Sequence, residues 1–267
     1  MSQPFVSIIM PTYNAEKTIV SSIKSVVAQT FVDWELIIVD DASTDTTLSL
    51  ATNLACTDTR IKVLHNAKNS GVAKSRNVAI LKAQGNWLAF LDSDDIWHKQ
   101  KLQKQLHFMA ENQAKISFTA TAFMNGVGRR SSYLLPAKKR VKYKDLLKAN
   151  IMSCSSVIVC RGLMLQYPFP EGNLHEDYVV WLRILQNVKF AYGLNLPLLL
   201  YRVSKGSKSG RRFQSGMMVF RAYCKVGYPM PLAMVLTIRY GVGSVLKWRK
   251  VSFPESPKEM EPNRGIT

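Results

Sequence analysis

The chain has 267 residues, 47% of them hydrophobic, which is enough to bury a full core as one large domain or as one domain with an appendage. Its 36 Lys and Arg against 18 Asp and Glu give a formal charge of +18, which favours a polyanionic or phosphorylated partner. Four scattered cysteines contain no C-x-x-C pair, so neither a disulfide framework nor a zinc site is indicated. The N-terminus lacks the pattern of a secretory signal, so we expect a cytoplasmic protein.

Short apolar runs alternate with helical patterns through the N-terminal third. Helices are predicted at about 15–29, 44–54 and 71–84, and strands at 5–10, 34–40, 61–66 and 86–92. Near-continuous apolar strands that alternate with helices are typical of a parallel sheet covered on both faces. The sequence therefore predicts an α/β fold with a mostly parallel, Rossmann-like sheet and helices on both faces.

The alternation is less regular after residue 95. We predict helices at about 99–111 and from near His175, and strands at 115–124, 155–160 and 196–203. Apolar and basic residues mix at helical spacing from 212 to 249, with a break at the GYPMP of 227–231. Arg239 interrupts the longest apolar run, so we expect no membrane-spanning helix.

Polar residues follow each of the first four predicted strands. The four turns read PTYN (11–14), DDAS (40–43), NAKNSG (66–71) and DSDD (92–95). Ligands of open parallel sheets bind beyond the carboxyl ends of the strands, where these turns meet. Any one of them is also explained by ordinary turn and helix-cap chemistry. Ordinary turn chemistry does not explain why two of these turns, DDAS and DSDD, each carry adjacent carboxylates, however. The four turns together therefore favour a binding crevice.

The crevice has no glycine-rich phosphate loop of the G-x-G-x-x-G or P-loop kind. A bound phosphate would therefore need another source of positive charge. The negative charges of the three aspartates in FLDSDDIW (90–97) repel one another unless a cation neutralises them or solvent screens them. Carboxylates together with substrate diphosphate oxygens suit Mg²⁺ or Mn²⁺, which predicts a divalent metal at this turn.

The chain resembles the large family-2 glycosyltransferases in five ordered segments: VSIIMPTYNAEKTI, ELIIVDDASTDTT, NSGVAKSRNVAI, GNWLAFLDSDDIW and HEDYVVWLRIL. The resemblance covers about residues 4–205, and it specifies fold and reaction class without specifying the sugar. It implies a GT-A fold, an inverting reaction, a nucleotide-sugar donor and Mn²⁺ or Mg²⁺ as cofactor. Residues 1–210 would form the glycosyltransferase domain, with a nucleotide-sugar half at about 1–97 and an acceptor half at 98–210.

The resemblance also implies a donor site. Thr12 and Tyr13 would line a uracil pocket, Asp41 would bond the base, Asp92 would lie near the ribose and Asp94 would bind the metal. Asp95 would cap the following helix, and Asp40 is explained equally well as a cap. Lys74 or Arg76 would lie near ribose or diphosphate, although an exposed helical face explains both as well. The predicted donor-binding set is Pro11, Thr12, Tyr13, Asp41, Lys74, Arg76, Asp92, Ser93, Arg202 and Ser207, the last two in a loop at 201–210 that also offers Lys205.

An inverting displacement needs a base across the sugar from the metal. The HED of 175–177 opens a predicted helix, and the resemblance places the acidic motif of the family there. Asp177 is the predicted base, and Glu176 would orient the acceptor. Trp181, four residues on, could stack on a sugar ring or be a plain core aromatic. His175 could equally be a surface residue.

The C-terminal segment, 211–267, is predicted to be a basic amphipathic extension. From Tyr178 to Pro254 there are 13 Lys or Arg and no Asp or Glu. Basic residues interleaved with Tyr, Leu, Met and Val suit contact with an anionic membrane surface, although the apolar residues could instead pack on the core. We expect a peripheral protein on the inner face of the cell membrane.

The predicted reaction is transfer of a hexose or N-acetylhexosamine from a nucleotide sugar, with UDP as the expected nucleotide, in β-linkage to a lipid-linked or growing polysaccharide acceptor. The acceptor types suggested by the resemblance are O-antigen, capsule or lipopolysaccharide units, carried on undecaprenyl diphosphate. Two alternatives stay open, a metal-dependent nucleotidyltransferase and an inactive carbohydrate-binding scaffold. Nucleic acid is not an expected partner, because the chain has no recognised binding motif and an acidic crevice would repel a phosphate backbone.

Overall fold

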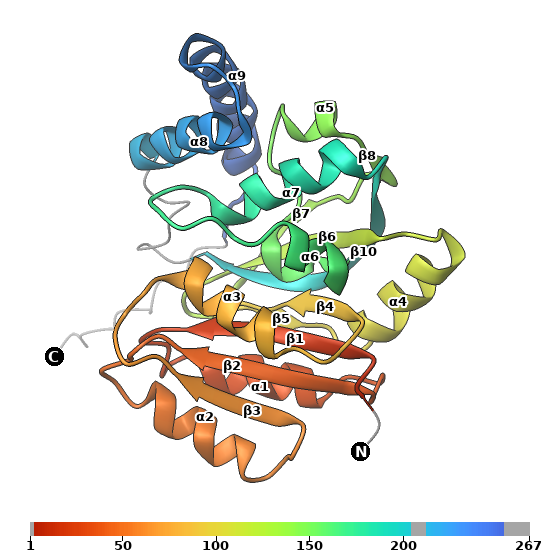
Figure 1. Ribbon diagram of the computed structural model, residues 1–267, viewed down its shortest axis with the longest axis vertical. Coiled ribbons are helices and arrows are strands. Elements are labelled where there is room, and N and C mark those ends of the chain that lie inside the picture. Colours follow the sequence, from red (N-terminus) through yellow and green to blue (C-terminus); the bar gives the residue numbers. More distant parts are fainter. Residues whose placement is uncertain (1–2, 204–211, 254–267) are drawn as a thin grey trace, which may run out of the picture.

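The computed structural model describes residues 3–203 and 212–253, and of 212–214 and 245–249 it describes the backbone alone. The N-terminal half alternates strands and helices as predicted (Figure 1). Its strands are β1 (Val6–Thr12), β2 (Trp34–Asp40), β3 (Ile61–His65) and β4 (Trp87–Phe90), and its helices are α1 (Ile19–Val27), α2 (Thr47–Ala55) and α3 (Val72–Lys82). The strands lie in the order β3-β2-β1-β4, and every neighbouring pair is parallel. The predicted parallel half is confirmed.

The second half of the sheet is mixed. Its strands are β5 (Ile96–Trp97), β6 (Ile116–Asn125), β7 (Arg130–Leu135), β8 (Arg140–Val141), β9 (Ile158–Cys160) and β10 (Ala191–Val203). β9 lies between β4 and β6 and is antiparallel to both, whereas β10 is parallel to β6. A parallel strand needs a crossover connection, and β9 is instead entered from a short 3₁₀ turn, Cys154–Ser156. The mostly parallel arrangement therefore ends at β4.

Two layers of helices cover the sheet because side chains alternate along each strand. Ile8 and Met10 of β1 join a cluster with α1 and with α4 (Lys101–Glu111). Ile9, between them, joins the opposite cluster with α3 and α7 (Glu176–Asn187). Two short helices, α5 (Tyr143–Leu146) and α6 (Arg161–Gln166), lie on this second side.

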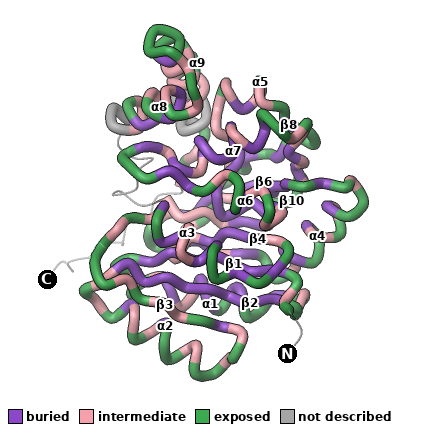
Figure 2. The backbone as a smooth tube through the Cα atoms, viewed as in Figure 1, coloured by how far each residue is buried: buried purple, intermediate pink, exposed green. Residues whose placement is uncertain are grey.

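The C-terminal helices α8 (Arg212–Val226) and α9 (Met230–Arg249) pack beyond α7, at the top of Figure 1. Val219, Ala222, Tyr223 and Ala233 are buried and belong to the same core cluster as α7. The outer face of α9 is largely exposed (Figure 2). In the described part of the chain, no helix combines the length and the apolar character that a membrane crossing requires.

Candidate active site

A cavity of about 470 Å³ lies at the carboxyl ends of β1, β2 and β4. Seven predicted donor residues line it, and so does the predicted metal ligand Asp94. The register of the sheet causes this convergence, because Thr12 of β1 pairs with Asp40 of β2 and the backbone amide of Asp41 donates to the carbonyl of Thr12 at 2.9 Å. The seven are Pro11, Thr12, Tyr13, Asp41, Arg76, Asp92 and Ser93, and the lining also includes Asn14, Ser75 and Tyr201, which sequence reasoning missed.

Asp41 holds the wall of this cavity together. Its carboxylate accepts hydrogen bonds from the side chain of Asn66 at 2.8 Å and from the backbone amides of Ser70 at 3.0 Å and Gly71 at 2.7 Å. Burial by itself would raise the pKa of Asp41, but these hydrogen bonds outweigh it and lower the pKa. The ionised carboxylate therefore fixes the loop that leads into α3.

Asp40 serves the neighbouring turn and lies outside the cavity lining. It is fully buried, accepts a hydrogen bond from the backbone amide of Ser43 at 3.0 Å, and pairs with Nδ1 of His65 at 3.0 Å. Asp40 thus stabilises the turn after β2, and it does not cap the next helix, because α2 begins at Thr47 with Thr46 as its N-cap.

The three aspartates of the DSDD turn have different environments. Asp92 and Asp94 line the donor cavity, whereas Asp95 is fully buried and accepts the backbone amide of Arg202 at 2.9 Å. The prediction that Asp95 caps the next helix is wrong, because β5 intervenes and α4 has Gln100 as its N-cap. Asp95 instead ties the turn to β10.

Arg202 supports this turn from the other side. Its Nε donates to the backbone carbonyl of Asp94 at 2.9 Å, and Nη1 donates to the carbonyl of Gly126 at 3.3 Å. Arg202 is absent from the lining of the donor cavity, so in this structure it braces the DSDD turn. Lys205 and Ser207, predicted for the same loop, lie outside the described residues.

The DSDD turn fits a divalent cation. Burial and the nearby charge of Asp92 raise the pKa of Asp94 to about 6, so its ionised form is less stable than that of an ordinary aspartate, and a bound cation would stabilise it. The described residues contain no group of three or more His, Cys, Asp or Glu that could hold a metal. Mg²⁺ and Mn²⁺ can be bound by one or two carboxylates plus substrate phosphates, so Asp94, with Asp92 beside it, suits an ion that binds together with a nucleotide.

Asp94→Asn is expected to stabilise the ligand-free protein by roughly 1–3 kcal/mol at neutral pH, although it removes the predicted metal ligand. A carboxyl whose pKa is raised to about 6 by folding destabilises the native state when ionised, and the amide has no charge. The gain should disappear as the pH falls through about 6 toward 4, because the parent then protonates. Urea unfolding across this pH range measures it.

Asp45→Asn is the matched control. Burial would raise the pKa of Asp45, but hydrogen bonds from Thr47 and Glu16 outweigh it and lower the pKa, so this substitution should be destabilising or neutral. An Asp94→Asn protein less stable than the parent at neutral pH would contradict the electrostatic account of the turn.

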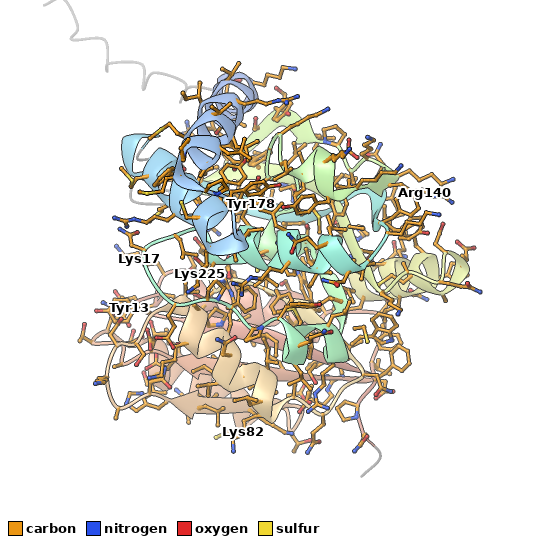
Figure 3. The ribbon with its side chains drawn as sticks, turned by 45° about the horizontal axis from the view of Figure 1, so that its top comes forward. Tyr13, Lys17, Lys82, Arg140, Tyr178 and Lys225 are labelled. Atoms are coloured by element: carbon orange, nitrogen blue, oxygen red, sulfur yellow. The ribbon has the colours of Figure 1, made fainter. Side chains whose placement is uncertain are left out.

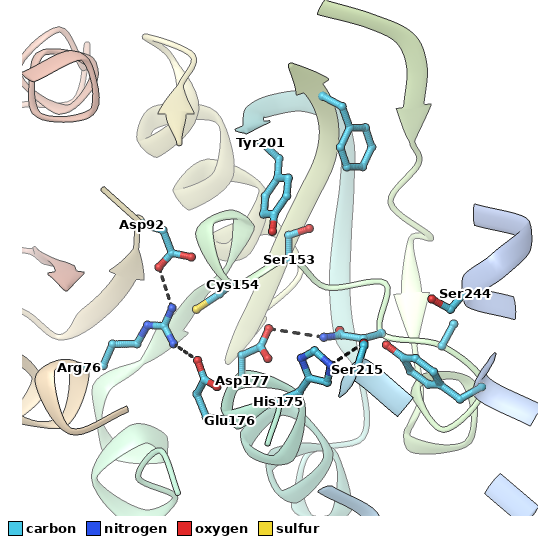
Figure 4. A pocket seen from close by; sticks show the side chains of 14 residues that line it. Arg76, Asp92, Ser153, Cys154, His175, Glu176, Asp177, Tyr201, Ser215 and Ser244 are labelled. Atoms are coloured by element: carbon cyan, nitrogen blue, oxygen red, sulfur yellow. Dashed lines mark hydrogen bonds and ion pairs between the residues drawn. The ribbon is translucent and has the colours of Figure 1, made fainter. Parts of the chain in front are cut away.

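A second cavity, of about 180 Å³, adjoins the donor cavity, and four residues line both: Arg76, Asp92, Glu176 and Tyr201. Figure 4 shows the guanidinium of Arg76 between the two acids. Its Nη2 donates to Asp92 at 2.7 Å and its Nη1 to Glu176 at 2.9 Å. Arg76 therefore joins the carboxyl end of β4 to the start of α7. Sequence reasoning placed Arg76 near ribose or diphosphate and did not predict this bridge.

Asp177 faces the second cavity. Its carboxylate accepts a long hydrogen bond from the side-chain amide of Asn150 at 3.5 Å. It also accepts one from the backbone amide of Tyr178, the next residue, at 2.8 Å. Burial and the adjacent charge of Glu176 raise the pKa of Asp177. Glu176 is held by the arginine, so Asp177 is the better proton acceptor of the pair.

Two predicted side chains lie elsewhere. Trp181 is fully buried against Phe90 and Phe169, with ring centroids 5.8 and 6.2 Å away, so of its two possible roles the structure supports the core aromatic and not the contact with an acceptor sugar. It follows Asp177 by one helical turn, but it belongs to the core cluster and lines neither cavity. Lys74 is exposed on α3 and lines neither cavity.

Several residues that line the second cavity could not be identified as site residues from the sequence. They lie in the loop before β9 and in α8 and α9, segments that become neighbours only when the chain folds. His175, which sequence reasoning could not assign, also lines this cavity, with Nε2 3.0 Å from the hydroxyl of Ser215. The others are Asn150, Ser153, Cys154, Ser215, Tyr240 and Ser244.

The chain is similar to known glycosyltransferases. The family model described as "Glycosyl transferase family 2" matches residues 7–164. A Bacillus subtilis protein named putative teichuronic acid biosynthesis glycosyltransferase TuaG is 38% identical over 224 residues, which are 84% of this chain and 89% of that protein. An Escherichia coli protein, WfgD, named UDP-Glc:alpha-D-GlcNAc-diphosphoundecaprenol beta-1,3-glucosyltransferase, is 38% identical over 80% of this chain and 83% of its own length.

Solved structures show the same fold. S. aureus TarS 1–349, solved in complex with UDP-GlcNAc, matches with a TM-score of 0.70 and 22% identity, over 91% of this chain and 73% of that one. The mannosyltransferase PcManGT of Pyrobaculum calidifontis, in complex with GDP-Man and Mn²⁺, matches with a TM-score of 0.67 and 18% identity, over 93% of this chain and 76% of that one. The chain belongs to glycosyltransferase family 2, has the GT-A fold, and is a glycosyltransferase.

Proposed function

We propose that the protein transfers a hexose or N-acetylhexosamine from a UDP-sugar to a lipid-linked saccharide in polysaccharide biosynthesis, with inversion to a β-linkage. The observation that carries this proposal is the pair of adjoining cavities, which meet at the Asp92–Arg76–Glu176 bridge. The larger cavity would hold the donor, and the smaller would hold the acceptor. The sugar anomeric carbon would lie where the two meet.

The roles of the two acidic clusters follow from their places on opposite sides of this junction. Asp177 would accept the proton of the attacking hydroxyl, and Glu176 would keep Arg76 in position. Asp94, with Asp92, would hold the divalent cation, which when bound supplies positive charge for the leaving diphosphate. A base on one side and the leaving group on the other suit an in-line displacement, which inverts the anomeric centre.

The names of the relatives support the substrate classes. WfgD and a second E. coli protein, WfaP, which is 31% identical over 91% of this chain, are both named as β-1,3-glucosyltransferases that use UDP-Glc and an α-D-GlcNAc-diphosphoundecaprenol. TarS structures contain UDP or UDP-GlcNAc. UDP-glucose and a diphospholipid N-acetylglucosamine are therefore the first donor and acceptor to test.

The proposal is tested by incubating the protein with Mn²⁺, a series of UDP-sugars and a synthetic diphospholipid α-N-acetylglucosamine. We expect UDP release that depends on the acceptor, with a β-linkage in the product by NMR. A product with an α-linkage would rule out inversion. Equal turnover with and without EDTA would rule out the metal.

We further propose that the outer face of α9 contacts an anionic membrane. Six large apolar side chains there are exposed, including Val235 at 62% and Ile238 at 65%. This face lies in the stretch with 13 basic and no acidic residues, so apolar insertion and charge attraction would act together. The six are Met230, Leu232, Met234, Val235, Ile238 and Val242.

The double substitution Val235→Gln and Ile238→Gln should weaken flotation with phosphatidylglycerol-containing vesicles by about fivefold or more, since it removes two apolar side chains from the contact. Val127→Gln is the control, because Val127 is also exposed but lies in the turn between β6 and β7. Vesicles of phosphatidylcholine alone should bind the parent weakly. A parent that floats with neither kind of vesicle would rule out the membrane contact.

A further inference from the structure

The C-terminal helices are held against α7 by a cluster of tyrosines: Tyr143, Tyr178, Tyr223, Tyr228 and Tyr240. The hydroxyls of Tyr178 and Tyr223 lie 3.0 Å apart, and that of Tyr143 donates to that of Tyr228 at 2.9 Å. Tyr240 of α9 packs its ring 5.5 Å from that of Tyr178, centroid to centroid. Figure 3 shows Tyr178 where α7 meets these helices. Because hydrogen bonds are directional, these contacts fix the position of α8 and α9 relative to α7. Apolar contacts alone would allow several positions.

This position brings three side chains of α8 and α9, Ser215, Tyr240 and Ser244, into the lining of the cavity that contains Asp177. Ser215 is fixed by His175, the residue that precedes the acidic pair. α9 lies close to the segment before β9 at Gly243, where a Cβ would lie 3.4 Å from the backbone carbonyl oxygen of Lys148. The cavity that holds the predicted base is therefore completed by helices that lie beyond the match to the family model, which ends at residue 164.

The chemistry of this wall suits a neutral sugar ring. Asn150, Ser215 and Ser244 offer amide and hydroxyl groups, which can both donate to and accept from ring hydroxyls. Tyr240 adds a hydroxyl and an aromatic face. Among the described residues that line the cavity, the one Lys or Arg is Arg76, and its guanidinium is already paired with Asp92 and Glu176. The wall therefore offers little to a phosphate and much to a saccharide.

We propose that Ser215, Tyr240 and Ser244 form an acceptor-sugar subsite, in which α8 and α9 select the acceptor sugar and set which of its hydroxyls faces Asp177. This inference rests on the proposed function and assigns the acceptor half of the same site. It gives the C-terminal helices a part in acceptor choice in addition to any contact with lipid.

Ser244→Leu fills the cavity from the α9 side, and Tyr240→Phe removes one hydroxyl while keeping the ring that packs on Tyr178. With UDP-glucose and a synthetic diphospholipid N-acetylglucosamine, we expect Ser244→Leu to raise the KM for acceptor about tenfold or more. Tyr240→Phe should raise it about two- to tenfold, the value of one neutral hydrogen bond. The KM for donor and the Kd for UDP should stay within about twofold, because neither residue lines the donor cavity.

Gly241→Leu is the matched control on the same helix, because a Cβ at Gly241 would meet no atom within 4 Å. Selectivity is a second readout: Tyr240→Phe should change the ratio of kcat/KM for the N-acetylglucosamine and N-acetylgalactosamine acceptors, which a merely structural role would not. If Ser244→Leu does not fold, as judged by its Tm, Ser244→Ala replaces it, with an expected two- to tenfold rise in acceptor KM.

The outcomes separate the inference from the proposed function. A parent that transfers sugar, with an acceptor KM that is unchanged in Ser244→Leu and Tyr240→Phe, overturns the inference alone. A parent that binds UDP but transfers to neither acceptor overturns the proposed acceptor class, and with it this subsite.

Discussion

Asp177→Asn is expected to lower kcat for glycosyl transfer by about 10²–10⁴, the usual contribution of a general base. The substitution keeps the shape of the side chain and its contact with Asn150, so the KM for donor should change by no more than about threefold. Burial and the charge of Glu176 disfavour the ionised aspartate, so Asp177→Asn should fold at least as stably as the parent. Initial rates at saturating donor and acceptor measure the effect.

The pH dependence of the parent gives an independent check. The pKa of Asp177 is raised above its ordinary value of 3.8, and the protonated acid cannot accept the proton of the acceptor. The rate should therefore fall on the acid side at a pH above that of an ordinary aspartate. Asp33→Asn, a change at an exposed aspartate in the loop before β2, should keep the parent profile. A profile and kcat unchanged in Asp177→Asn would place the base elsewhere.

Arg76→Met is expected to reduce the free energy of unfolding by about 3 kcal/mol, near the lower end of the cost of breaking a buried ion pair. The guanidinium is almost fully buried and holds two carboxylates of unequal exposure, at 31% for Asp92 and 9% for Glu176. Removing the guanidinium takes this ion pair from the buried charge of Glu176. Water can partly solvate the charge of Asp92, because that side chain is more exposed. Urea unfolding at neutral pH measures the loss.

Arg76→Lys should recover only part of this stability, because one ammonium group cannot reach both carboxylates with the planar geometry of a guanidinium. Lys74→Met is the matched control, since Lys74 is an exposed cation on the same helix and should contribute less than about 0.5 kcal/mol. An Arg76→Met protein as stable as Lys74→Met would show that the bridge does not hold the two halves of the site together.

The parallel half of the sheet and its crevice could be predicted because the controlling interactions are local. Strand β2 was predicted at 34–40 and is observed as Trp34–Asp40. Apolar runs and helical spacing depend on neighbours along the chain, and topology then sends every strand end to one edge. The turns that follow β1, β2 and β4 accordingly contribute to the donor cavity.

Burial could not be predicted with the same success. The sequence left Trp181 open between a sugar contact and a core position and gave no reason to bury Lys101, yet both are fully buried. For Trp181 the reason is the packing of α7 against Phe90 and Phe169, and for Lys101 the Nζ donates to Gln105 at 2.8 Å above the ring of Trp97. Phe90 is remote from Trp181 in the sequence, so no short window contains both. Gln105 is close to Lys101, but its amide in turn donates to Ser117 and Ser156 of other segments, which only folding brings near.

The sequence by itself determined the fold class, the family and the identities of the charged groups of the site, since those depend on residue types at short spacing. Only the tertiary structure decided how those groups are used. It tied Asp95 to β10 instead of to the next helix, placed Arg76 as a bridge between two cavities, and brought α8 and α9 to the wall that faces Asp177. The physical reason is that ion pairs, hydrogen bonds and cavities depend on distances in space, which packing of remote segments sets.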